Sequence, residues 1–303
     1  IPLDIEYVDS GTEVFDWEVP MEWRISEARL IGPDGKVYAD LDESNLEVVN
    51  YSEPVDRRLS LEELDSHLYT DPEVPDATPY VTSYYDREWG FCLPHSTYES
   101  LPDGEYHAYI DSEFVDGRLP FAHTKLEGQS DEEVLLSSYL CHPSMANNEL
   151  SGPLVLSALY SRIEKWNQQH YTYRFVLAPE TIGSLCYLDR YGEHLQQHLV
   201  SGAVLTCLGG PADKLRFQHS RNGSSLLDDI VRNQSNHEES PIRTTEFTPI
   251  NGSDERQYCS PGFNLPVGQF ARTVYGEYSG YHNSNDTKEF MTINALIRSI
   301  DEI

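Results

Sequence analysis

One stretch, EVLLSSYLCHPSMANNELSGPLVLSALYSRIEKW from Glu133 to Trp166, decides the fold. It begins with an apolar run typical of a strand that is buried on both faces of a parallel sheet. It ends with apolar residues at helical spacing. Between them lies CHPSMANNELSG, residues 141–152, with a histidine, two asparagines and a glutamate close together. The order of strand, polar loop and helix predicts an α/β domain, and the loop is either a metal site or a helix cap.

The chain that follows repeats this alternation of strand and helix. Further strands are predicted at 171–179, 200–208 and 263–270, and further helices at 182–199, 225–234 and 292–303. Strands that alternate with helices of this length indicate a largely parallel sheet covered on both faces. In such sheets ligands bind at the carboxyl ends of the strands, so polar residues there are the candidates for function.

The part of the chain before about Gly128 has a different pattern. Short alternating runs, separated by Gly, Pro and Asp turn signals, predict antiparallel strands at 26–32, 36–41, 46–52, 80–85 and 105–112. One helix is expected at 59–68, where Ser60 and Glu63 have the spacing of a capping box. The sequence therefore predicts a β-rich region ahead of the α/β domain.

Charge excludes two classes of partner. Fifty-one acidic residues oppose twenty-one basic ones, which gives a formal charge of −30. Such a chain lacks the basic surface that nucleic acids and anionic membranes require, so neither partner is expected. The simplest interpretation of the acidity is a strongly hydrated surface. No apolar run approaches the about 20 residues that a membrane helix needs.

The five cysteines are widely spaced and form no CxxC motif. Their apolar flanks and odd number favour buried free thiols in a reducing compartment, and hence a cytoplasmic protein. The start at Ile1 rather than Met indicates a trimmed chain.

Four metal-ligand or acid/base residues lie at the ends of predicted strands: His142, Glu180, Asp254 and His282. A parallel sheet would bring them to one edge, where a catalytic zinc needs three N/O ligands and one open position. Each also has a structural interpretation: a turn histidine, a helix N-terminal carboxylate, an Asx-turn residue and a surface histidine. Asn147 and Asn148 are most simply explained as caps of the following helix.

Several long motifs carry a resemblance. CHPSMANNELSG, PETIGS, GSDERQYCSPG and the YH of GYHNSNDT occur in the order typical of the zinc exopeptidases. That clan includes leucyl aminopeptidases, glutamate carboxypeptidase and glutaminyl cyclase. With WGFC added, the chain more closely resembles bacterial aminopeptidase-like proteins associated with polysaccharide biosynthesis. The resemblance covers nearly the whole chain.

The resemblance implies a three-layer zinc-exopeptidase-like α/β domain with a mostly parallel central sheet, plus a β-rich inserted domain. The α/β domain would comprise residues 1–22 and 118–303, and the inserted domain residues 23–117. The helix before this region and the winged-helix-like extension after it, both usual in that family, are not recognisable in this sequence.

Roles also follow from the resemblance. His142, Asp254 and His282 match metal ligands, and Tyr281 matches a donor to the oxyanion. Glu180 is either the general base or a ligand itself, because only one carboxylate of the usual pair is present.

The chain departs from that pattern at three carboxylates. Asn148 stands where an aspartate bridges two zinc ions, Pro179 precedes the single Glu180, and Ser144 replaces an aspartate near His142. A neutral amide is a poor bridge between two divalent ions, so one zinc ion is predicted rather than two. Asn148 and Glu149 remain weaker candidates for ligands.

Two functions follow. The first is an aminopeptidase-like hydrolase of an amide bond, in which zinc-activated water reacts with Glu180 as general base, on a peptide-like or small-molecule substrate. The alternative is a non-catalytic metal- or ligand-binding module on a degenerate peptidase fold. The sequence gives no indication of the oligomeric state.

Overall fold

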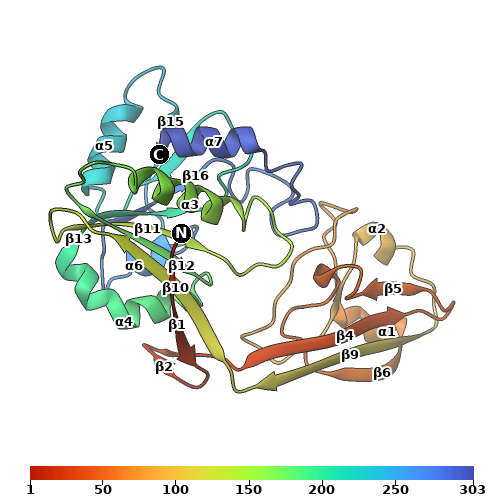
Figure 1. Cartoon of the computed structure of the whole chain (residues 1–303). Coiled ribbons are helices and arrows are strands. Elements are labelled where there is room, and N and C mark those ends of the chain that lie inside the picture. Colours follow the sequence, from red (N-terminus) through yellow and green to blue (C-terminus); the bar gives the residue numbers. More distant parts are fainter.

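An eight-stranded mixed sheet organises the larger part of the molecule, as seen in a computed structural model that describes residues 1–303 (Figure 1). Its strands, in spatial order, are β1 (Asp4–Asp9), β10 (Arg118–Leu126), β12 (Thr172–Ala178), β11 (Glu133–Tyr139), β13 (Leu199–Leu205), β16 (Val267–Ala271), β14 (Leu215–Gln218) and β15 (Ile242–Thr245). The four central strands β12, β11, β13 and β16 are parallel. On one side β10 is antiparallel to this centre and the edge strand β1 is antiparallel to β10, so β1 runs with the central strands. On the other side β14 and β15 are parallel to each other and antiparallel to the centre.

Helices cover both faces of this sheet, which gives the expected three layers. The helices α3 (Ser151–Ile163), α5 (Leu226–Ser235) and α7 (Ile293–Glu302) pack on one face, and α4 (Ile182–His198) and the short α6 (Glu255–Tyr258) on the other. Neighbouring residues of β11 face opposite sides of the sheet: Leu135 belongs to the core under α4 and Leu136 to the core under α3. The expected α/β fold is confirmed, with a sheet that is parallel at its centre.

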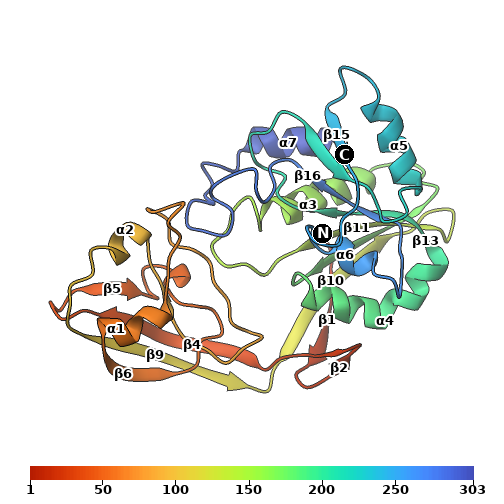
Figure 2. The same ribbon diagram turned by 180° about the vertical axis from the view of Figure 1, so that it is seen from behind.

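A second, four-stranded sheet forms what we call the small lobe, residues 22–115 (Figures 1 and 2). Its order is β5 (Val37–Asp40), β4 (Glu22–Ile31), β9 (Glu105–Val115) and β6 (Val55–Ser60), with antiparallel pairing throughout. It also carries α1 (Leu61–Leu64), where Ser60 and Glu63 form the predicted capping box, and α2 (His95–Tyr98). The lobe has its own apolar core. Its status as an independent inserted domain with the bounds given above stays a prediction.

Two of the strands predicted in this lobe are not present. Residues 46–52 form a short 3-10 helix followed by isolated bridges, and residues 80–85 form no strand. The tyrosines of 80–85 contact a cavity and other rings instead of a sheet neighbour. The strands β1, β6, β10, β14 and β15 were not predicted. Their polar residues leave little apolar alternation to detect. None of the helices combines the length and apolar character that crossing a membrane requires.

The two lobes are joined by a hydrogen-bonded contact far from the chain connections, which we call the interlobe bridge (residues 78–80 with 282–284). Tyr80 N donates to His282 O at 2.8 Å, and Ser284 N donates to Thr78 O at 2.9 Å. Thr78 N in turn donates to Ser284 Oγ at 3.0 Å. In both views the blue loop of the large lobe reaches toward the orange part of the small lobe (Figures 1 and 2). The bridge fixes the small lobe against the loop that carries His282.

Candidate functional site

The ends of the parallel strands bring the predicted residues to one edge of the sheet. His142 follows β11, Glu180 follows β12, and His282 lies in the loop after β16. His142 Nε2 lies 3.6 Å from Glu180 Oε2, and the rings of His142 and His282 are 4.9 Å apart between centroids. Residues separated by up to 140 positions are therefore neighbours here, as the topology predicts.

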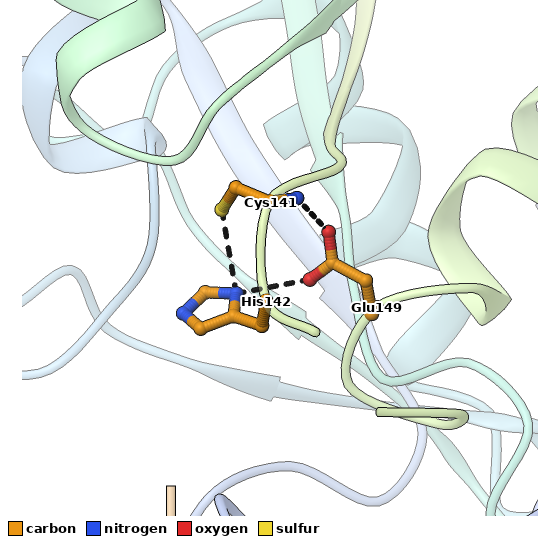
Figure 3. Close-up of side chains that lie close together, drawn as sticks. All are labelled: Cys141, His142 and Glu149. Carbon is orange, nitrogen blue, oxygen red and sulfur yellow. Dashed lines mark hydrogen bonds and ion pairs between the residues drawn. The ribbon is translucent and has the colours of Figure 1, made fainter. Parts of the chain in front are cut away.

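The ring of His142 is held from one side by Glu149 (Figure 3). Its Nδ1 lies 2.9 Å from Glu149 Oε2, while the other carboxylate oxygen accepts the Cys141 N–H. A carboxylate can only accept, so Nδ1 carries the proton and Nε2 keeps its lone pair for another partner. This is the arrangement in which a second carboxylate orients a metal-binding histidine. Glu149 is thus placed to orient His142, and its direct ligation stays the weaker prediction.

Cys141 is a site residue that sequence reasoning missed. Its thiol lies 3.4 Å from His142 Nδ1 and accepts the Glu180 N–H at 3.2 Å, so it links the loops after β11 and β12. Donor atoms of Cys141, His142 and Glu149 all lie within 4.8 Å of one another. The expectation of five buried thiols is wrong for Cys141, which is exposed, and holds for the other four. Its position directly before His142 was the available signal.

Two predicted ligands end in buried atoms without a protein partner. Asp254 Oδ1 accepts from Thr181 N at 2.7 Å and from Ser184 Oγ at 3.0 Å, but its Oδ2 is buried and unpaired. His282 Nε2 and, among the weaker candidates, Asn148 Oδ1 are likewise buried and unpaired. Unsatisfied buried polar atoms are costly, and a cation bound by these atoms would satisfy them.

Glu180 is positioned by a second residue of the GSD motif. Ser253 Oγ donates to Glu180 Oε1 at 2.5 Å, which leaves Oε2 directed at His142. The carboxylate does not cap α4, since that helix begins after Thr181 without a side-chain cap. Glu180 is therefore no side-chain cap of α4, although it stands directly before Thr181, the N-cap residue of that helix. Ser253 went unnoticed in the sequence, although it directly precedes Asp254.

Burial dominates the electrostatics of these groups. It raises the pKa of Glu180, and together with the negative charge of Glu180 it raises the pKa of Asp254 to about 8. Burial and the nearby His142 lower the pKa of His282 to about 3. For His142, burial favours the neutral ring, but the hydrogen bond to Glu149 and the charge of Glu180 raise its pKa overall. A site of crowded carboxyl groups beside a neutral histidine is one in which a divalent cation would restore charge balance.

The asparagines do not cap α3, so that interpretation is wrong. The helix begins after Leu150 with no side-chain cap. Asn147 instead bonds Thr273 O and Gly209 N, and Asn148 Nδ2 donates to the Tyr139 hydroxyl at 2.5 Å. The backbone N–H groups of both asparagines donate to the carboxylate of Asp286 at 2.8 Å. These bonds tie the loop after β11 to the loop that carries His282.

Two tyrosines flank the histidines from different sides. Tyr281 stacks on His282 with centroids 3.9 Å apart and lies outside the lining of the adjacent cavity. Tyr80 of the small lobe packs edge-on against His142 at 5.3 Å and His282 at 5.5 Å, and it does line the cavity. No sequence signal connects Tyr80 to the site, because only the interlobe bridge brings it there.

Backbone strain is concentrated in the same loops. Ser144, Thr181 and His282 have φ values of 56°, 61° and 55°, in the left-handed region that residues other than glycine rarely adopt. Such residues persist where the surrounding contacts hold them, and they gather at functional sites.

Comparisons with known proteins place this geometry in a family. The whole chain, residues 1–303, matches the family described as a domain of unknown function (DUF4910). A relative from Clostridium acetobutylicum is 41% identical over 299 residues, covering 99% of this chain and 68% of the relative. Its name provisionally assigns it to polysaccharide biosynthesis, with an aminopeptidase-like domain.

Solved structures also include similar aminopeptidase-like folds. A crystal structure from the same organism, provisionally described as a peptidase, matches with a TM-score of 0.93 and 40% identity, covering 100% of this chain and 70% of that one. A zinc aminopeptidase from Bacillus subtilis shares the fold, with a TM-score of 0.70 and 12% identity over 99% of this chain and 82% of that one. The chain therefore belongs to the DUF4910 family, whose aminopeptidase-like domain has the fold of the zinc exopeptidases.

Proposed function

We propose that this protein is a metal-dependent hydrolase of amide bonds, with one zinc ion held by His142, Asp254 and His282. The observation that carries the proposal is the pair of buried, unpaired atoms, Asp254 Oδ2 and His282 Nε2, together with His142 Nε2, which faces Glu180 Oε2 at 3.6 Å. These oxygen and imidazole donors are the types that zinc prefers. Asn148 supports a single ion, because a neutral amide cannot offset the repulsion between two.

The chain's own residues would divide the work as follows. Glu180, held by Ser253, takes a proton from the attacking water and delivers it to the leaving amine. Its raised pKa suits a base that must also release the proton. Glu149 keeps His142 in one tautomer. Tyr281 is the proposed donor to the developing oxyanion, a role that requires its hydroxyl to reach the cavity from its position outside the lining. When bound, zinc supplies Lewis acidity and lowers the pKa of water.

The Glu180→Gln variant tests the assignment. With aminoacyl anilides as substrates, we expect at least about 100-fold lower kcat with zinc content unchanged, because general-base catalysis contributes about 10²–10⁴-fold. Plasma emission spectrometry should give one zinc ion per chain. Glu132→Gln, an exposed glutamate outside the site, is the matched control. Unchanged hydrolysis in Glu180→Gln would refute the role of Glu180, and metal binding without any hydrolysis by the unmodified chain would favour the binding-module alternative.

We also propose the cytoplasm as the location, because all five cysteines are unpaired and disulfides are rare in that compartment.

A further inference from the structure

The candidate site opens into a cavity of about 770 Å³ between the two lobes. The large lobe contributes His142, Glu180 and His282 to its lining. A substrate that reaches Glu180 must therefore pass the surface that the small lobe presents to this cavity.

That surface is rich in aromatic rings, and we call it the aromatic wall: Trp23, Tyr51, Tyr84 and Tyr85. The rings contact one another in sequence. Trp23 stacks on Tyr51 at 5.8 Å and 18°, Tyr51 packs against Tyr84 at 5.8 Å, and Tyr84 lies 4.1 Å from Tyr85 between centroids. The indole N–H of Trp23 is bonded to Ser52 O, so its polar group is already satisfied.

The small lobe's own core does not account for this wall. That core is formed by other residues, and Tyr85 is 68% exposed. One exposed ring, Tyr85, continuous with partly buried rings that line a cleft, beside a few polar groups such as Asn50 and Thr82, is typical of a ligand pocket. The aromatic wall is also fixed relative to the candidate site. Tyr80 begins the segment that carries Tyr84 and Tyr85, and its backbone N–H donates a hydrogen bond to His282 O.

We propose that the aromatic wall binds a six-membered ring of the substrate, stacked on Tyr84 and Tyr85, while the amide lies at Glu180. This rests on the proposed hydrolase function and adds the substrate class: amides whose remote part carries a ring with an apolar face, either aryl or pyranose. Aromatic faces bind such rings by stacking, and the polar groups in the lining would orient their substituents. The small lobe thus determines specificity, and the large lobe carries the chemistry.

Binding rather than turnover tests the proposal. Dissociation constants are measured by ligand-observed NMR titration for acetamide, phenylacetamide and N-acetylglucosamine, which offer an amide alone, with an aryl ring and with a pyranose ring. We expect at least one ring-bearing amide to bind more tightly than acetamide. Tyr85→Ala should weaken that ligand about three- to tenfold and leave acetamide unchanged. Tyr85→Phe should retain the preference, because it keeps the ring face.

Trp166→Ala is the matched control, since Trp166 is an exposed aromatic residue, 48% accessible, that does not line the cavity. Tyr84→Ala repeats the test at the neighbouring ring. Equal binding of all three amides, or a ring preference that both alanine variants retain, would overturn the proposal. Loss of the preference in Tyr85→Phe would refute stacking. A ring preference in a chain that hydrolyses no amide would instead leave the subsite standing and remove the proposed function.

Discussion

Replacing Glu149 by Gln should weaken zinc binding without unfolding the protein. The carboxylate uses one oxygen for the Cys141 N–H and the other for His142 Nδ1, at 2.9 Å. Gln offers a single acceptor oxygen, so one of these donors loses its partner, and the charge that fixes the His142 tautomer disappears. A hydrogen bond to a charged group contributes about 1.5–3 kcal/mol. At about 1.4 kcal/mol per factor of ten, zinc affinity should fall about 10- to 100-fold.

The assay is competition for zinc against a chromophoric chelator at pH 7.5, with far-UV circular dichroism to verify folding. Glu133→Gln is a matched control, because Glu133 is also 3% exposed and hydrogen-bonded but lies at the opposite end of β11. It should lower stability and leave zinc affinity unchanged. If Glu149→Gln binds zinc as tightly as the unmodified chain, Glu149 does not orient His142 and the assignment is wrong.

Three further predictions concern stability. Gly152→Ala should cost about 1–3 kcal/mol in urea unfolding, because an added Cβ would lie 2.2 Å from Ser138 Oγ; an unchanged midpoint would contradict the close approach of α3. Arg174→Met should cost about 3–5 kcal/mol, since it removes the buried charged partner of Glu133 and leaves only the contact with His194, and adding Glu133→Gln should recover part of this loss. Burial alone would raise the pKa of Glu133, but the hydrogen bonds from Arg174 and His194 lower this pKa overall. The charged carboxylate therefore stabilises the fold at pH values above the pKa of Glu133 in the unfolded chain. This stabilisation is lost as the pH falls through the lower pKa of Glu133 in the folded protein. The urea midpoint should therefore drop less on acidification below pH 4.5 in Glu133→Gln than in the unmodified chain, and equal drops would refute the linkage.

Periodicity was sufficient to predict the layers and the approach of His142 to Glu180. The apolar run at 133–139 and the helix beginning near 151 are present, and the strand-end rule brings His142 to Glu180. These features are local, or follow from parallel topology alone. The roles of Asn147 and Asn148 could not be predicted, because their partners lie in other loops. Asparagine is used both to cap helices and to hydrogen-bond one loop to another, and only the tertiary structure distinguishes the two roles.

The same limit applies to the small lobe. The segment 80–85, rich in tyrosine and β-branched residues, is typical of a strand, yet its tyrosines line a cavity whose other wall comes from residues about 60 to 200 positions later. A sequence pattern of this kind indicates that some side chains are buried, but it does not indicate which part of the chain buries them.

The interlobe bridge has a consequence for the order of events in folding. Thr78 and Ser284 are 206 residues apart, so this contact closes a very long loop, and closing long loops is slow. During synthesis all residues of the small lobe leave the ribosome before the loop with residues 282–284, the other half of the interlobe bridge, has been made. Tyr80 can meet the two histidines only after residue 284 has left the ribosome. The candidate site would therefore be completed last, after the residues of the small lobe have left the ribosome.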